Sequence, residues 1–303
     1  VPLTESRYGS AGNAFEGGYA LQNIKIDNEA TTNYVISDTR MRINLPKPLA
    51  AKGGKITFSM DFEFSIPEYG ADRTGILPTK NGKVYSIAQW YPRVCVFDDI
   101  LGWNTTPYTG PGEFYLEFGD FNVEITAPAN HIVALGGELL NPSEVWTPTQ
   151  LARYNEAKNS DKTVMIRPLS EVTNKNSRPN KKEITWKYRL ENAHDVAWTS
   201  STSFIVDAAK INLPSGKTSL ALSLYPEESN GKNGWERSTE YTKASVEHYS
   251  KKWLEYPYPV AVNVASNVGG MEYPALSFCG YNAKGGDLWG VTDHEFGHNW
   301  FPM

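Results

Sequence analysis

Two histidines near the end of the chain stand at the spacing that lets one helix present both to a single metal ion. His294 and His298 are four residues apart, so on an α-helix their imidazoles project from one face, about one turn apart. Two nitrogens placed in this way can share one Zn²⁺. Glu295 faces the same pocket from one side, where a carboxylate acts as a base on metal-bound water rather than as a ligand. The segment therefore predicts a zinc-dependent hydrolytic site.

The two histidines are an incomplete ligand set. Catalytic zinc usually takes three protein ligands and one water, and none of the five residues after His298 is a plausible third ligand. Either an upstream group supplies it or the ligand lies beyond Met303. Two neutral imidazoles lack the charge and geometry of a full set, so these 303 residues alone are expected to bind zinc weakly or not at all. The alternative is a pair of structural histidines on a core helix.

The composition is that of a globular protein with a sizeable core, at 40% hydrophobic and 21% charged residues. A net charge of -5 and the absence of a basic run argue against a nucleic-acid binder. The longest apolar stretches are too short for a transmembrane segment. No leader precedes Val1, so either a leader was removed or the chain is an excerpt. The aromatic-rich and asparagine-rich composition leans slightly towards an exported or periplasmic protein, with the compartment left open.

Alternating apolar and polar residues predict that residues 1–210 form a β-sheet domain. The alternation is clear over residues 56–66, 121–126 and 184–190, as expected for strands with one buried and one solvent-facing side. Strands of this kind belong to antiparallel sheets, so an all-β N-terminal domain, incomplete at its start, is expected. Residues 170–182, rich in Asn, Lys and Ser, are expected to form a solvated loop.

The pattern changes near residue 210, and residues 211–303 are expected to be the first part of a mixed α/β catalytic domain. The expected elements are a strand at 220–224, a helix at 235–254, a strand at 259–265 and a final helix, capped by Asp287, that carries the histidines. The chain is therefore expected to hold two domains.

Two cysteines, Cys95 and Cys279, are too few for a disulfide framework and are not spaced as metal ligands. Two buried free thiols are the expected state. A single Cys95–Cys279 disulfide is the alternative, and it would imply an oxidising compartment.

A second motif upstream makes the chain similar to a known family. Residues 269–274 read Gly-Gly-Met-Glu-Tyr-Pro, and 19 residues separate them from the histidine motif. Together the two motifs resemble the aminopeptidase N family of zinc metallopeptidases, to which the leukotriene hydrolase enzyme belongs. Its pattern is Gly-x-Met-Glu-Asn, His-Glu-x-x-His and a glutamate ligand about 18 residues further on, which makes it a gluzincin. The resemblance covers the whole chain and implies an all-β domain followed by a thermolysin-like α/β catalytic domain.

The resemblance implies a role for each matching residue. His294 and His298 become zinc ligands and Glu295 the general base, with the third protein ligand expected beyond Met303. Glu272 matches the family glutamate that binds the free α-amine of the substrate. A fixed carboxylate near the metal pairs with an ammonium group and so admits only N-terminal residues.

The resemblance also implies substrate contacts by residues other than the charged ones. Gly269, Gly270 and Met271 belong to a segment whose backbone approaches the substrate and hydrogen-bonds to it as a strand. Gln89, which begins the sequence Gln-Trp-Tyr-Pro-Arg, matches a segment with a second contact to the amine; a polar residue at a strand end is the alternative. Tyr273 stands where the family commonly has Asn, so contacts made by that Asn are in doubt.

These residues predict a zinc-dependent aminopeptidase that releases N-terminal residues from peptides with a free N-terminus, by means of metal-activated water. The present fragment is expected to be inactive. Two alternatives are a non-catalytic peptide- or glycan-binding homologue with a degenerate metal site, and an endopeptidase of the broader His-Glu-x-x-His class. Side-chain preference and oligomeric state are left open.

Overall fold

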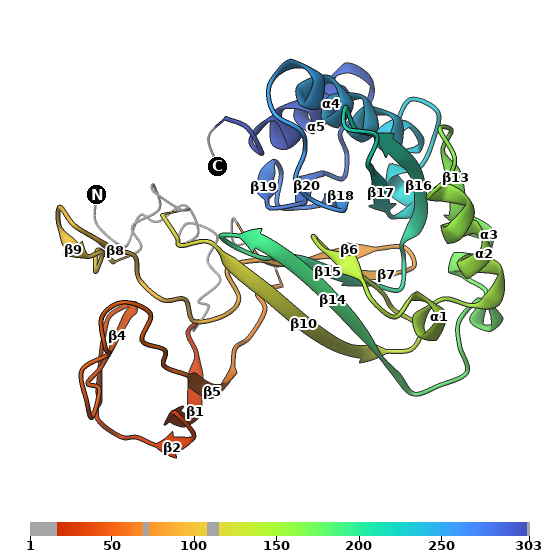
Figure 1. Cartoon of the computed structure of the whole chain (residues 1–303). Helices are drawn as coiled ribbons and strands as arrows, with labels where there is room; N and C mark the ends of the chain where they lie inside the picture. The colour runs from red at the N-terminus through yellow and green to blue at the C-terminus, as the bar shows by residue number, and fades with distance from the viewer. Residues whose placement is uncertain (1–16, 69–72, 108–114, 302–303) are drawn as a thin grey trace, which may run out of the picture. The chain divides into compact units, whose positions relative to one another are not determined.

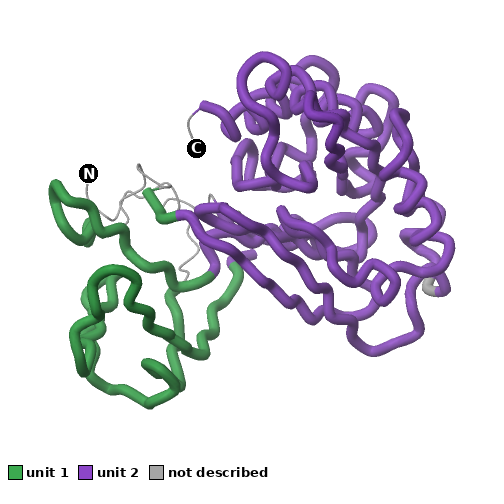
Figure 2. Tube along the Cα trace, viewed as in Figure 1, with its two compact units in different colours: residues 1–66, 91–117 green, residues 67–90, 118–303 purple. Residues whose placement is uncertain are grey.

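The computed structural model describes residues 17–68, 73–107 and 115–301. Contacts within the chain divide it into two units, residues 1–66 with 91–117 and residues 67–90 with 118–303 (Figure 2). The expected domain boundary near residue 210 falls inside β16 (Ile205–Asn212) of the second unit. The division into 1–210 and 211–303 stays a prediction.

The first unit is built of short antiparallel strands. β1 (Ala20–Ile26) lies between β2 (Glu29–Ala30) and β5 (Phe58–Glu63) in a three-stranded sheet. Two hairpins accompany the sheet: β3 (Tyr34–Ser37) with β4 (Arg40–Ile43), and β8 (Phe97–Asp98) with β9 (Gly102–Trp103).

Both cysteines are free thiols in the structure. Cys279 is buried as expected, but Cys95 is exposed, so the expectation of two buried thiols was wrong for Cys95. Cys95 lies just before the short hairpin of β8 and β9, where the small first unit buries little surface.

The described part of the second unit contains three sheets. The first has the order β10-β14-β12, from β10 (Gly119–Pro128), β14 (Glu183–Ala193) and β12 (Glu138–Leu139). The second has the order β11-β15-β7-β6, from β11 (Ile132–Leu135), β15 (Trp198–Ser201), β7 (Gly82–Ile87) and β6 (Gly75–Thr79). The long alternating segments predicted around residues 121–126 and 184–190 pair with each other as β10 and β14.

The third sheet carries Met271–Tyr273 of the upstream motif, and the helix with the histidine motif packs against it. Its six strands run in the order β13-β16-β17-β18-β20-β19, with β13 (Val164–Arg167), β17 (Thr218–Tyr225), β18 (Val260–Ser266), β20 (Leu276–Gly280) and β19 (Met271–Tyr273). The pairs β17–β18 and β18–β20 are parallel, and the other pairs are antiparallel. Every residue of β18 is buried, as expected for a strand covered on both faces.

Two helices lie on one face of this sheet (Figure 1). α4 (Ser238–Lys252), preceded by the 3₁₀ turn η5 (Trp235–Arg237), packs against β16, β17 and β18. α5 (Gly285–Gly297) packs against β20 and α4. After residue 210 the helices α4 and α5 are separated by three strands, β18, β19 and β20, of which one was expected from the sequence. Within the described ranges, no helix combines the length and the apolar character needed to cross a bilayer.

The expected cap of the last helix was wrong. α5 begins at Gly285 after Lys284, so Asp287 lies inside the first turn rather than before it. The main-chain N–H of Gly285 donates to Asn233 O, which fixes this earlier start. A carboxylate in the first turn still interacts favourably with the helix dipole.

The described residues up to 210 are mostly, but not entirely, β structure. Among them the helices are α1 (Pro142–Val145), α2 (Pro148–Ala157), α3 (Leu169–Val172) and the 3₁₀ turn η3 (Lys175–Ser177); η4 (Glu227–Ser229) follows later. The start of α2 carries a helix-capping signal, which apolar–polar alternation does not detect. Thr147 and Gln150 form a capping box around Pro148 at the first helical position.

The expectation of a solvated loop at 170–182 was wrong at Arg178, which is buried. Its guanidinium donates to the carbonyl oxygens of Ala129, His131 and Val145. These hydrogen bonds compensate the cost of burying the guanidinium charge. The polar composition of the segment gives no sign of this burial.

A buried carboxylate joins α4 to the third sheet. Asp207 on β16 accepts hydrogen bonds from Tyr225 Oη and Thr239 Oγ1, each at 2.6 Å. Burial is the main influence and raises the pKa of Asp207 to about 7, although the two hydrogen bonds oppose it. Thr239 belongs to the first turn of α4, so this contact fixes where the helix begins on the sheet.

The raised pKa of Asp207 predicts that stability falls as pH rises. Between the ordinary pKa of 3.8 and the folded value of about 7, the native state keeps a proton that the unfolded chain has released. The free energy of unfolding therefore decreases as pH rises through this window. Melting temperatures from about pH 5 to about pH 8 should fall less steeply for Asp207→Asn than for the parent. Equal slopes would contradict this prediction.

Candidate active site

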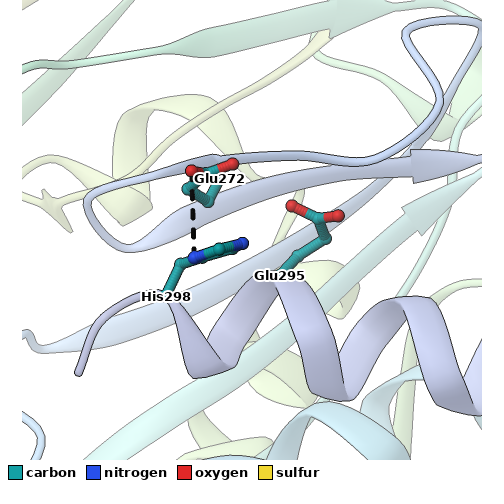
Figure 3. Close-up of side chains that lie close together, drawn as sticks. All are labelled: Glu272, Glu295 and His298. Atoms are coloured by element: carbon teal, nitrogen blue, oxygen red, sulfur yellow. Dashed lines mark ion pairs between the residues drawn. The ribbon is translucent and has the colours of Figure 1, made fainter. Parts of the chain in front are cut away.

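Three of the predicted side chains converge between β19 and α5. Ligand-type atoms of Glu272, Glu295 and His298 all lie within 4.8 Å of one another. Figure 3 shows Glu295 and His298 pointing from the helix towards the strand that carries Glu272. The Nδ1 atom of His298 is 4.0 Å from Glu272 Oε1. The two sequence motifs therefore meet at one site.

The imidazoles of His294 and His298 approach each other at the end of α5. Their Nε2 atoms are 3.1 Å apart, and two nitrogens bound to one tetrahedral zinc lie about 3.3 Å apart. His298 Nδ1 donates to the carbonyl oxygen of Phe301 at 3.0 Å, since a carbonyl only accepts. That bond leaves the Nε2 lone pair facing His294, which is the tautomer a metal ligand needs.

The two carboxylates share a poorly solvated space. Glu295 is buried, and its Oε2 atom has no hydrogen-bond partner among the described residues. Burial, and next the charge and hydrogen bond of Glu272, raise the pKa of Glu295 to about 8, while the positive charge of Arg73 opposes the shift. A divalent cation would favour the ionised forms. Two converging imidazoles beside two close carboxylates are thus a donor set that fits zinc.

The position of Glu272 follows from the alternation of β19. Met271 and Tyr273 point into the core and are buried, while Glu272 between them faces the site. β19 pairs with β20 on one side and ends the sheet order, so no described strand covers its other edge. An uncovered edge can hydrogen-bond an extended peptide. The Met271 side chain is buried, so a contact of Met271 with a substrate would use its main chain.

The glycine pair before β19 lets backbone pass close to Glu295. Gly269 has a φ of +95°, a conformation that glycine adopts without a steric penalty. A Cβ added at Gly270 would lie 2.4 Å from Glu295 Oε1, well inside van der Waals contact. Asn267 Nδ2 donates to the carbonyl of Ile76 at 3.2 Å, which ties this loop to β6.

Gln89 lies two residues after β7 and is half-buried. Its φ of +50° is unusual for a residue with a side chain. Such conformations cost about 1–3 kcal/mol and cluster at functional sites. Its contact with a substrate amine stays a prediction.

A further acid, which the sequence reasoning missed, stands beside the first histidine. Asp293 accepts hydrogen bonds from Ser245 Oγ and Tyr249 Oη of α4. The available signal was an acid next to the histidine motif and two hydroxyl residues four apart on the preceding helix.

Comparison with known proteins identifies the fold. No protein-family model matches the chain, and no curated protein matches it by sequence. An M1 zinc metallopeptidase from Deinococcus radiodurans matches 94% of the chain and 55% of its own length, with a TM-score of 0.55 and 13% identity. Aminopeptidase A from Legionella pneumophila, solved with aspartic acid, matches 93% of the chain and 29% of its own length, with a TM-score of 0.55 and 11% identity.

A mutant of the Deinococcus enzyme that matches equally well was solved with a Tyr-Ser-Ala substrate. The chain thus spans about half the length, or less, of the structures it matches. The likeness shows the M1 zinc metallopeptidase fold, in agreement with the family that the motifs resemble.

The close approach at Gly270 predicts that a methyl group there displaces the Glu295 carboxylate. In the protein at its natural length, the hydrolytic site predicted from the sequence should then lose about tenfold or more of its rate on aminoacyl anilides in Gly270→Ala, because small displacements of a reacting group are costly. Gly269→Ala is the matched control, since it strains the backbone but its Cβ meets nothing within 4 Å. An equal loss in both variants would show that loop strain, not contact with Glu295, is responsible.

Proposed function

We propose that this chain belongs to a zinc-dependent aminopeptidase that releases N-terminal residues from peptides. The observation that carries the proposal is the convergence of Glu272, Glu295 and His298 within 4.8 Å, on the two motifs that resemble the family. The second imidazole, from His294, lies against His298. The shared fold supports a peptidase at the level of architecture.

His294 and His298 are the residues that would hold the zinc. When bound, zinc polarises the scissile carbonyl and lowers the pKa of a water molecule. A catalytic zinc usually takes a third protein ligand, and the resemblance places that ligand beyond Met303, where it remains an expectation.

Glu295 is the proposed proton carrier. Its carboxylate is buried on the same helix as both histidines, so it can accept a proton from the attacking water and return it to the leaving amine. The close backbone of Gly270 limits where this carboxylate can go. A base held in this way loses little freedom when the substrate binds.

Glu272 is the proposed anchor for the substrate's α-ammonium group. It projects from the edge strand β19, so a peptide aligned along that edge would bring its first residue to the carboxylate. Internal peptide segments offer no ammonium, and the half-buried carboxylate would then lose its charge-assisted hydrogen bond to the substrate. The same proposal assigns Gln89 to a second amine contact and residues 211–303 to the first part of a thermolysin-like catalytic domain.

Replacing the base tests the assignment of Glu295. Glu295→Gln preserves size, so the protein at its natural length should still bind zinc but lose at least about a hundredfold in kcat on aminoacyl anilides. Zinc content by atomic absorption, measured beside kcat, separates loss of the base from loss of the metal. Retained turnover would rule out Glu295 as the base.

Replacing the amine anchor tests the exopeptidase assignment. Glu272→Ala should raise KM for free-amine substrates about 10–100-fold, the worth of a charge-assisted hydrogen bond. Glu272→Gln, which keeps the shape but not the charge, should lose nearly as much. If the parent cleaves N-acetylated peptides as well as free ones, the exopeptidase proposal fails.

A further inference from the structure

The contact between α4 and α5 is polar at the turn that precedes the metal motif. Ser245 Oγ donates to Asp293 Oδ1 at 2.8 Å, and Tyr249 Oη donates to Asp293 Oδ2 at 3.1 Å. Both oxygens of one carboxylate are therefore held by hydroxyl groups from one neighbouring helix. Ser245 is buried, and Asp293 and Tyr249 are half-buried, so water competes little for these bonds.

The preceding residue of α5 is tied to a different element. Asn263 Nδ2, on β18, donates to Thr292 Oγ1 at 3.1 Å. Thr292 and Asp293 point in directions about 100° apart around the helix. Two polar contacts in two directions, one to the sheet and one to α4, fix the rotation of α5 about its axis.

That rotation decides whether the site is assembled. The side chains of a helix lie about 5–6 Å from its axis, so a turn of about 20° would move Glu295 and the histidines by about 2 Å. Glu272 lies on β19, a separate element of the sheet, and would not follow. A change of this size would separate Glu295 and His298 from Glu272.

We propose that Asp293 is a positioning residue, which locks the rotation of α5 through Ser245 and Tyr249 and so presents His294 and His298 together for zinc. This inference rests on the proposed function for its metal, but the lock itself is a property of the metal-free chain. Asp293 touches neither substrate nor metal in this scheme.

Hydrogen exchange of the metal-free protein tests the lock directly. Asp293→Ala should speed amide exchange over residues 294–298 about fivefold or more relative to the parent, because the last turn of α5 gains freedom. Asp293→Asn, which keeps one acceptor oxygen, should fall between them. The double variant Ser245→Ala/Tyr249→Phe should match Asp293→Ala, and adding Asp293→Ala to it should change little more.

Thr239→Val is the matched control. It removes hydroxyl contacts from the same helix, but to Asp207 and Ser223 of the sheet rather than to α5. This control should lower the melting temperature without speeding exchange selectively at residues 294–298. Exchange that is unchanged in Asp293→Ala, or raised equally in Thr239→Val, would overturn the lock.

Zinc affinity, measured by competition with a chromogenic chelator on the protein at its natural length, separates the lock from the proposed function. Asp293→Ala should weaken zinc binding about tenfold or more, as loss of a residue that orients metal ligands does, and Thr239→Val should not. Unchanged zinc affinity in Asp293→Ala would show that Asp293 does not position the zinc ligands. A parent that binds no zinc while the exchange result holds would refute the proposed function and leave the lock standing.

Discussion

Two carboxylates that face each other across a poorly solvated gap repel, and the site depends on what offsets that repulsion. At about 4 Å and an effective dielectric constant near 20, two unit charges interact by about 4 kcal/mol. In the metal-free chain, burial first and the charge of Glu272 second raise the pKa of Glu295 to about 8, and protonation of Glu295 then removes the repulsion. A bound dication would do the same with both groups ionised. The surrounding elements must hold Glu272 and Glu295 together in either state.

The third sheet provides that support through its parallel centre. β17, β18 and β20 run in parallel, so the connections after β18 and after β20 both leave from the carboxyl ends of the strands. One connection leads through Gly270 to β19, and the other leads to α5. Polar residues that follow such strands meet outside their carboxyl ends, which is where open α/β sheets place their ligands. The meeting of Glu272 with Glu295 is therefore a result of topology.

Much of this arrangement could be predicted from the sequence, but only where the signal is local. The spacing of His294 and His298 predicts their shared face, and alternation predicts β10 and β14 as strands, although their pairing with each other is seen only in the structure. Glu272 was assigned through a resemblance, since no local pattern says that an acid in a turn will face Glu295, 23 residues further along. The helix α2 was not predicted, because it is marked by the side chains of its capping box and not by the spacing of its apolar residues.

The contacts that could not be predicted all join residues distant in the chain. Arg178 looks like a loop residue until three carbonyls from elsewhere in the chain satisfy it. From the sequence, Gly270 is a turn residue. In the structure, the lack of a side chain at Gly270 leaves the space that the Glu295 carboxylate occupies. In both cases the sequence shows the residue type, and the reason for it lies in a neighbour that only the folded chain supplies.

Apolar packing and directional hydrogen bonds both hold α5, and the hydrogen bonds lie near the end of the helix that carries the site residues. Near its start the helix is anchored by apolar packing, with Leu288 fully buried and Trp289 against Tyr241 at 5.1 Å between ring centroids. Apolar packing is non-directional and tolerates small rotations. Near its end the helix buries Phe296 on one side, while Glu295 and the two histidines face a polar site. Directional bonds to Thr292 and Asp293 add to that packing and set the angle of the helix about its axis.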